Sequence, residues 1–231
     1  MDLLEAVRSR KSIRAFKSTF VSQTALKEII EAALRAPSWG NTQPWEFAIV
    51  IGEKLEAIKK KFAAKASADE KHNLDVAAPL WFPEPFDSRR RAIGRKMFEL
   101  KEIDRKDMEK RRYWELQGLG LFGAPAVIYI CTDRSFYFQE QQVNAWALFD
   151  CGMIAENIML LAAGQGLGTV PQIQAVGYPN VLREVLKIPD SKLIVLGIAI
   201  GYPDWNDPLN QFESEREPLE NIAAWYGFDN R

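Results

Sequence analysis

Three apolar stretches decide the fold: Ala126–Thr132 (AVIYICT), Gln141–Ala163 (QQVNAWALFDCGMIAENIMLLAA) and Leu193–Ile200 (LIVLGIAI). The first and third are short, rich in β-branched residues and free of charge, which predicts buried strands. The second is too long for a strand. It carries Asp150 and Glu156 near its middle, where charges would be costly in a bilayer, so it predicts a buried helix rather than a membrane span.

The N-terminal half continues the alternation of helix and strand. Apolar residues at helical spacing predict one helix over Asp2–Arg10 and a second that starts near Ser22 or Thr24 and ends before Pro37. The run Trp45–Ile51 (WEFAIVI) predicts another buried strand. Strands separated by helices, with few hairpin signals, indicate an α/β or α+β sandwich.

The region Lys65–Gly123 differs from the rest of the chain. Three prolines between residues 79 and 85 exclude regular structure there, and Ser88–Gln117 is highly charged with helical periodicity. We therefore expect residues 1–231 to form a single domain that carries a charged, mainly helical insertion at about residues 65–123.

Composition excludes several classes of function. Lys and Arg number 30 and Asp and Glu 31, so the chain has no net drive toward nucleic acid or an anionic membrane, and we expect neither as a partner. The single histidine, His72, lies in a polar stretch, which weakens Ser-His-Asp, Cys-His and zinc chemistries. Cys131 and Cys151 sit in apolar runs as small hydrophobes. The first residues do not resemble a signal peptide, and we expect a cytoplasmic protein without a metal.

One glycine pattern is misleading. Gly118-Leu-Gly-Leu-Phe-Gly123 matches the G-x-G-x-x-G fingerprint of dinucleotide-binding proteins, but that fingerprint needs a strand before it and a helix after it. Here a charged helical stretch precedes the glycines and a strand follows. The glycines are therefore expected to end a helix and turn the chain into the strand.

A basic segment near the N-terminus is a candidate anion site. In Arg8–Arg14 (RSRKSIR), the side chains of Arg10, Ser12 and Arg14 point the same way if the segment is extended. Guanidinium forks and a hydroxyl on one side suit an elongated phosphorylated ligand. The alternative is a solvated basic face.

Three further segments are weaker candidates. The loop Ala36–Phe47 places small polar residues around Trp39, although it can also be an ordinary helix-to-strand loop. Gly166–Gln172 (GLGTVPQ) can bring backbone amides close to a flat ligand, or can be a helix end followed by an edge strand. In Asn210–Leu219, Arg216 stands among acids that can simply pair with it.

Taken in order, RKSIR (10–14), PSWGNTQPW (37–45), GLGTVP (166–171) and SEREPL (214–219) resemble the FMN-binding nitroreductase family. The resemblance covers Arg10 to Pro218 apart from the insertion. It implies an α+β fold, a three-layer α/β/α sandwich with a central mixed sheet, built as an intertwined homodimer with two FMN sites at the interface.

The resemblance also implies which residues bind FMN. Arg10, Ser12 and Arg216 would hold the phosphate with Lys11 beside it, and Arg14 would lie near the N1–C2 carbonyl edge of the ring. Ser38 and Trp39 would come from the partner subunit, Pro37 would also contact the cofactor, and Asn41 and Gln43 would reach ribityl or pyrimidine atoms. One face of the ring would be covered by Val170, Pro171, Gln172 and Ile173. Some relatives have lysine where this chain has Ser214, so that phosphate contact is in doubt.

The implied activity is transfer of a hydride from NADH or NADPH, through FMN, to a nitroaromatic or quinone in a ping-pong cycle. The flavin N5 carries the hydride, so no catalytic side chain is expected. The alternatives are an FMN-dependent ene-reductase or reductive dehalogenase, and a flavin-binding protein without turnover. A set of aromatic residues in the insertion either walls the substrate pocket or packs the insertion on the core: Trp81, Phe82, Phe86, Tyr113 and Trp114.

Two features favour a homodimer independently of the resemblance. The helix predicted over Gln141–Ala163 is apolar on most of its faces, so most of its faces must be covered. The tail Asn206–Arg231 has few core-like runs and yet contains scattered aromatic residues, which gain most by packing on a neighbouring subunit.

Overall fold

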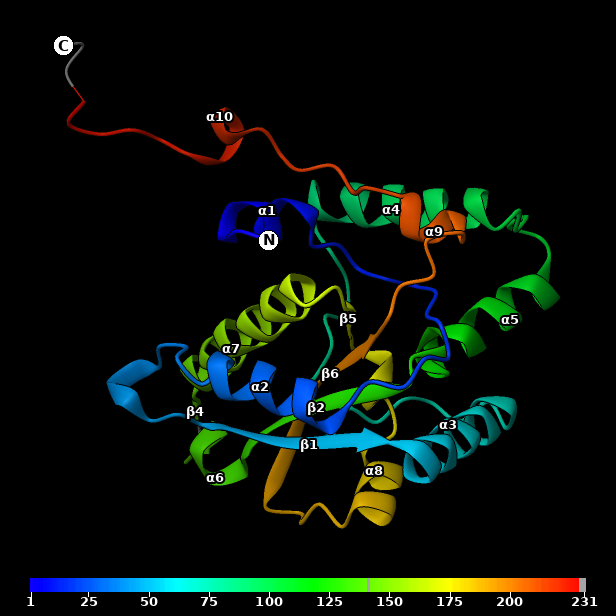
Figure 1. Cartoon of the computed structure of the whole chain (residues 1–231), viewed down its shortest axis with the longest axis horizontal. Helices are drawn as coiled ribbons and strands as arrows, with labels where there is room; N and C mark the ends of the chain where they lie inside the picture. The colour runs from blue at the N-terminus through cyan, green and yellow to red at the C-terminus, as the bar shows by residue number, and fades with distance from the viewer. Residues whose placement is uncertain (141, 229–231) are drawn as a thin grey trace.

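The computed structural model describes residues 1–140 and 142–228. The helices and strands follow one another along the chain as shown in Figure 1. In chain order they are α1 (Leu3–Ser9), α2 (Gln23–Ala33), η1 (Trp39–Asn41), β1 (Trp45–Ile51), α3 (Gly52–Ser67), α4 (Phe86–Leu100), α5 (Met108–Leu119), η2 (Leu121–Gly123), β2 (Ala126–Asp133), α6 (Arg134–Tyr137), β3 (Phe138–Gln139), β4 (Gln142–Val143), α7 (Ala145–Gly164), β5 (Gly168–Gln172), η3 (Gln174–Val176), α8 (Pro179–Leu186), β6 (Lys192–Gly201), α9 (Pro208–Gln211) and α10 (Leu219–Ile222).

The central sheet has four strands in the order β1-β2-β6-β5. Its three strand pairings are antiparallel. The parallel component of the sheet is an isolated bridge between Ser12 and Thr169, which adds the N-terminal segment to the edge strand β5. The two interior strands, β2 and β6, correspond to the stretches predicted at Ala126–Thr132 and Leu193–Ile200.

The prediction for Trp45–Ile51 was only partly right. The strand exists, but β1 is an edge strand whose Ile49 is about half exposed. An unbroken apolar run does not distinguish an interior strand from an edge strand whose apolar side chains are exposed in the single chain.

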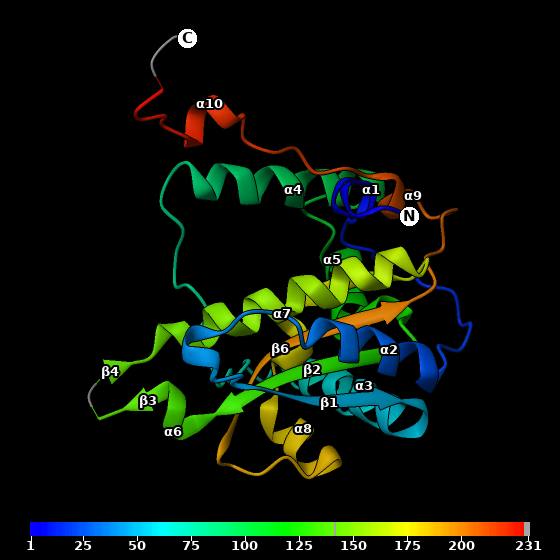
Figure 2. The ribbon, with the colours of Figure 1, turned by 60° about the vertical axis from the view of Figure 1, so that its left-hand side comes forward.

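Alternate residues of the interior strands face two separate cores, as strand geometry requires. Ile128, Ile130 and Ile198 face α2 and α7, while Val127 and Tyr129 face α3 and α8. The result is helices on both sides of the sheet, which is the predicted three-layer α/β/α sandwich within an α+β fold (Figure 2).

Capping side chains explain where several helices begin. The Asp2 carboxylate accepts from Glu5 N at 2.8 Å and starts α1. Ser22, rather than Thr24, starts α2, because its hydroxyl accepts from Ala25 N at 3.1 Å. Such caps satisfy amide groups that lack a partner in the first turn.

In the described part of the chain, α7 is the one helix long and apolar enough to cross a membrane. Its Asp150 is buried, and its buried face packs against α2 and the sheet, as the prediction of a core helix requires. Its other face leaves Trp146, Phe149 and Met153 exposed at helical spacing.

The predicted insertion consists of an irregular segment, residues 68–85, followed by α4 and α5. Phe86, which directly follows the last of the three prolines, is the first residue of α4. The glycine pattern acts as predicted, because α5 ends at Leu119 and η2 turns the chain into β2. In both ribbon views α4 lies away from the sheet, beside α9 and the C-terminal segment (Figures 1 and 2).

Candidate functional site

The N-terminal basic segment is held against the edge strand β5. Ile13 N donates to Thr169 O at 2.9 Å, and the buried Ile13 side chain packs on Gly168, where a Cβ would lie 2.5 Å from Ile13 Cγ1. This close approach requires glycine at position 168. Segments 10–14 and 170–173 are therefore brought together within one chain.

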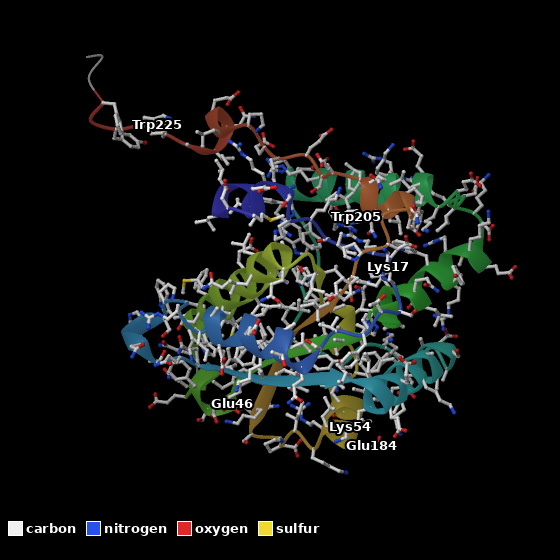
Figure 3. The ribbon with its side chains drawn as sticks, in the orientation of Figure 1. Lys17, Glu46, Lys54, Glu184, Trp205 and Trp225 are labelled. Atoms are coloured by element: carbon white, nitrogen blue, oxygen red, sulfur yellow. The ribbon has the colours of Figure 1, made fainter. Side chains whose placement is uncertain are left out.

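Arg10 and Lys11 lie at a small cavity of about 180 Å³ beside this contact. Arg10 pairs with Glu156 of α7 at 3.3 Å, and Lys11 Nζ lies 3.9 Å from Glu213. Lys11 also lies over the ring of Trp205, 5.5 Å from its centroid, and Figure 3 shows Trp205 between α9 and α7. Two cations with weakly held carboxylate partners form a site that suits a phosphate.

Arg14 lies at a second cavity, of about 370 Å³. Its backbone N donates to Asn210 Oδ1 at 2.8 Å, and its Nη1 donates to Ser12 O at 3.2 Å. Burial of the guanidinium lowers the pKa of Arg14. A guanidinium keeps its charge even so, and a partly desolvated cation favours an anion or an electron-rich ligand edge nearby.

Asn210 is a positioning residue that sequence analysis missed. It is fully buried, and its Nδ2 donates to Ala15 O at 2.7 Å and to Asp204 O at 2.8 Å. Together with its bond to Arg14 N, it fixes the backbone on which Arg14 stands. The only signal was an asparagine one helical turn after an Asp-Pro pair, and such pairs are common in turns.

Strand β5 contributes a buried acceptor. The Gln172 side chain is buried, and its Nε2 donates to Gly118 O at 3.3 Å. Its Oε1 has no hydrogen-bond partner among the described residues. Val170 is also buried, whereas Ile173 is 45% exposed, so the strand end presents both apolar and acceptor atoms.

Arg216 lies in the segment after α9. Lys11 and Glu213 approach each other within 3.9 Å, so this segment runs close to the N-terminal segment. The guanidinium of Arg216 is exposed and turns back on its own chain, donating to Ser214 Oγ at 2.6 Å. Ser214, the departure from the family pattern, is thus a partner of Arg216 here.

The loop at residues 37–43 lies elsewhere. Trp39 N donates to the buried Asp150 carboxylate of α7 at 3.2 Å, and Gln43 N donates to Ser38 Oγ at 3.0 Å. Gln43 Nε2 also donates to Asn41 Oδ1 at 3.3 Å. In both ribbon views the loop lies at the opposite end of α7 from the N-terminal segment (Figures 1 and 2). One chain therefore does not bring Pro37, Ser38, Trp39, Asn41 and Gln43 to the other predicted contacts.

The five aromatic residues considered for the substrate pocket separate into two groups. Tyr113 and Trp114 of α5 line the cavity at Arg14. Trp81, Phe82 and Phe86 lie outside it and are exposed, and Phe82 and Phe86 lie beneath arginines of α4. Their role in a substrate pocket stays a prediction.

Within residues 1–140 and 142–228, no group of three His, Cys, Asp or Glu side chains is arranged to hold a metal ion. Burial raises the pKa of both Cys131 and Cys151 to about 12, so their thiols are protonated at neutral pH and are poor ligands and nucleophiles.

The fold and these cavities together define a class: an α/β/α sandwich with basic residues beside cavities along one edge of its sheet. Comparison with known proteins makes the class specific. Residues 7–202 match the Nitroreductase family, and the chain belongs to this family.

Individual relatives cover almost the whole chain. It is 30% identical to a 4-nitrobenzoate reductase of Pseudomonas putida, over 99% of this chain and 97% of that protein. It is 31% identical to a nitrobenzene nitroreductase of Ectopseudomonas oleovorans, over 96% and 95%. Among solved structures, the FMN and NADPH-dependent nitroreductase NfnB from sphigopyxis sp. strain HMH has a TM-score of 0.91 at 30% identity, covering 99% of this chain and 100% of that one.

Proposed function

We propose that this protein is an FMN-dependent oxidoreductase that uses NADH or NADPH to reduce electron-poor organic substrates, nitroaromatics or quinones. The observation that carries the proposal is the attachment of the basic segment 10–14 to β5, which places cations and the strand end on one continuous surface. The similarity to proteins named as nitroreductases, and to a structure named as FMN and NADPH-dependent, supports it.

The residues present fit FMN. The small cavity at Arg10 and Lys11 offers cations for the phosphate, with Ser12 adjacent. The unpartnered Gln172 Oε1 is a buried acceptor of the kind that a ring N–H can satisfy. Arg216 stands three residues after Glu213, whose carboxylate lies 3.9 Å from Lys11 Nζ, and would bind the phosphate once its hydrogen bonds to Ser214 are exchanged for it.

FMN bound here would supply the hydride chemistry that links the nicotinamide to the second substrate. The protein's own residues would bind and orient the flavin and adjust the charge around its ring. Arg14 supplies positive charge where a reduced ring becomes negative, and partial burial strengthens that interaction. Over one cycle, NAD(P)H and a proton convert a nitro group to a nitroso group and water. None of these steps requires a protein side chain to remove a proton from carbon.

The active unit of this proposal is a homodimer. Its support is exposed apolar surface on three separated elements: Leu3, Leu4 and Val7 on α1; Trp146, Phe149 and Met153 on α7; and Leu219, Ile222, Trp225, Tyr226 and Phe228 in the tail. The tail leaves the body of the molecule in all three figures, and Trp225 is labelled near its end in Figure 3. Exposed apolar side chains in such number are typical of an obligate interface.

A second chain would also complete the flavin site. The loop containing Ser38 and Trp39 lies apart from Arg10–Arg14 in one chain, and Trp39 is 65% exposed. If the loop of a partner subunit reaches across the interface, its Trp39 is covered and the loop lies beside Arg10–Arg14 of the other chain. We place this dimer in the cytoplasm, without nucleic acid or membrane partners.

The colour of the protein tests the proposal directly. The purified protein should be yellow, release FMN on denaturation, and lose its colour under anaerobic conditions when NADH or NADPH is added. A nitroaromatic added next should restore the colour. In turnover, each two-electron reduction of the nitroaromatic should consume one equivalent of NADH or NADPH. A colourless protein, or a yellow one that neither donor reduces, contradicts the proposed activity; the second result leaves only a flavin-binding protein.

A further inference from the structure

The cavity of about 370 Å³ at Arg14 has a composition that the flavin site does not explain. It lies between the segment after Arg14 and helix α5. Three cations line it, Arg14, Lys101 and Lys110, together with one carboxylate, Asp207. Its apolar wall includes the aromatic rings of Tyr113 and Trp114.

The cations outnumber the acids that neutralise them. Lys101 Nζ pairs with Asp207 Oδ2 at 2.6 Å, which leaves Arg14 and Lys110. Arg14 Nη1 donates to a backbone carbonyl, Ser12 O, and Lys110 Nζ donates to another, Glu102 O, at 2.9 Å. Of the residues that the structure describes, neither cation has a carboxylate within salt-bridge distance. The cavity therefore carries an excess of about two positive charges.

Excess positive charge in a partly enclosed space favours an anionic ligand, because a desolvated cation gains most from an opposite charge. The flat aromatic wall favours a ring, which can pack on Tyr113 and Trp114. The volume is in the lower part of the usual range for small-molecule pockets, which suits a single substituted ring better than a whole dinucleotide.

We propose that this cavity makes the enzyme selective for aromatic substrates that carry a carboxylate. The inference rests on the proposed function and narrows its substrate class. Arg14 connects the two sites, because its backbone continues through Ser12 to the contact with Thr169 on β5. A ring whose carboxylate lies between Arg14 and Lys110 is held beside the predicted flavin edge. Lys110 and Lys101 are specificity-determining residues, and neither is among the predicted FMN contacts.

Binding without turnover gives the first test. Benzoate and benzamide have nearly the same shape and differ in charge, so calorimetry on the FMN-loaded protein should show binding of benzoate and much weaker binding of benzamide. Lys110→Met should weaken benzoate binding about tenfold, the size of one charge-assisted hydrogen bond. Lys106→Met is the matched control, since it removes the same charge from an exposed lysine in the turn before α5. Equal binding of benzoate and benzamide would overturn the proposal.

A second variant should act in the opposite direction. Asp207→Asn removes the only carboxylate that lines the cavity and frees Lys101, while an asparagine at this position can still accept from Leu209 N and cap α9. Benzoate should then bind more tightly than to the wild type. Weaker binding of benzoate, or no change, would contradict the charge argument. Because tighter binding is expected, a variant that fails to fold cannot give the expected result.

Turnover separates this proposal from the proposed function. The wild type should prefer 4-nitrobenzoate to its neutral methyl ester, and Lys110→Met should lower kcat/KM for the acid about tenfold while leaving the ester unchanged. If the ester is reduced and the acid has no advantage, the selectivity inference is wrong and the proposed function stands. If neither is reduced but benzoate binds as expected, the proposed function is wrong and the anion site stands.

The cations could instead serve the phosphates of the hydride donor or of FMN. Rapid-mixing measurement of flavin reduction by NADH and NADPH, and titration of the apoprotein with FMN, distinguish these sources. Lys110→Met should change neither. A slower reduction by NADPH, or weaker FMN binding, would assign the cavity to the donor or the cofactor and overturn selection of a substrate carboxylate.

Discussion

The segment Arg10–Arg14 and the loop at residues 37–43 look alike in the sequence and differ in the structure. Both are polar, both follow a helix, and both were expected to contact one FMN. The first is bonded to β5 and to Asn210, while the second is bonded to Asp150 and lies toward the other end of α7 in both ribbon views. Both can contact a single flavin only if the loop comes from another chain. The hydrogen bonds that hold each segment therefore bear on which subunit's site it can serve, which residue types alone do not.

The largest effect is expected when the two regions are disabled in different chains. Arg10→Ala with Arg216→Ala removes two charge-assisted contacts, together about 3–6 kcal/mol, and should abolish activity at ordinary FMN concentrations. Ser38→Ala with Trp39→Ala should also abolish activity, by removing the contacts of the loop at residues 37–43. Mixed dimers formed on co-expression should recover roughly half of wild-type activity, because each of them has one intact site of two.

The measurement is specific activity of mixed dimers isolated with two different affinity tags. No recovery in confirmed mixed dimers would mean that both regions serve the same chain's site. If the protein is monomeric by light scattering and still reduces its substrates, the proposal that two chains build each active site is wrong.

Asn210→Ala should have the next largest effect and should act on the first region alone. It leaves Arg14 N, Ala15 O and Asp204 O without a buried partner, so we expect the free energy of unfolding to fall by about 3 kcal/mol. Urea denaturation of the apoprotein measures this loss. Asn206→Ala, at an exposed position nearby, should change stability by less than about 0.5 kcal/mol. Equal stability of the two variants would show that Asn210 does not hold the segment.

Arg216→Ala alone should weaken FMN binding about tenfold or more, as expected for the loss of a charge-assisted contact worth about 1.5–3 kcal/mol. Because the guanidinium is exposed and bonded only to its own segment, stability of the apoprotein should not change. Fluorescence titration with FMN measures the affinity. Arg8→Ala removes the same charge from an exposed position on α1 and serves as the control. Unchanged affinity in Arg216→Ala would exclude this residue from the phosphate site.

The smallest effect concerns the aromatic residues of the insertion. Trp81→Ala and Phe82→Ala remove exposed rings, so we expect little loss of stability, intact FMN content and a change in substrate preference of roughly tenfold or less. Ratios of kcat/KM for several nitroaromatics measure the preference. Unaltered ratios, or unfolding of the variants, would favour the alternative that these residues only pack the insertion.

The predictions from sequence were most successful where one local property controls the outcome. The interior strands β2 and β6, the core helix α7 and the helix-ending role of Gly118–Gly123 followed from hydrophobic run length and glycine position. Asn210 was missed because its role depends on three backbone groups that only folding brings to one side chain. Likewise, the charges at Lys101 and Lys110 belonged to a region that looked uniformly charged, and only the folded chain shows that they face Arg14.

The sequence by itself determined the succession of strands and helices and the family, because periodicity and short ordered motifs are properties of neighbouring residues. Tertiary structure decided which motifs share a surface: it attached Ser12 to Thr169, separated Trp39 from both, and enclosed Arg14, Lys101 and Lys110 in one cavity. The physical reason is distance along the chain. A site assembled from segments some 150 residues apart is defined by the packing of a sheet edge, and no local pattern encodes that packing.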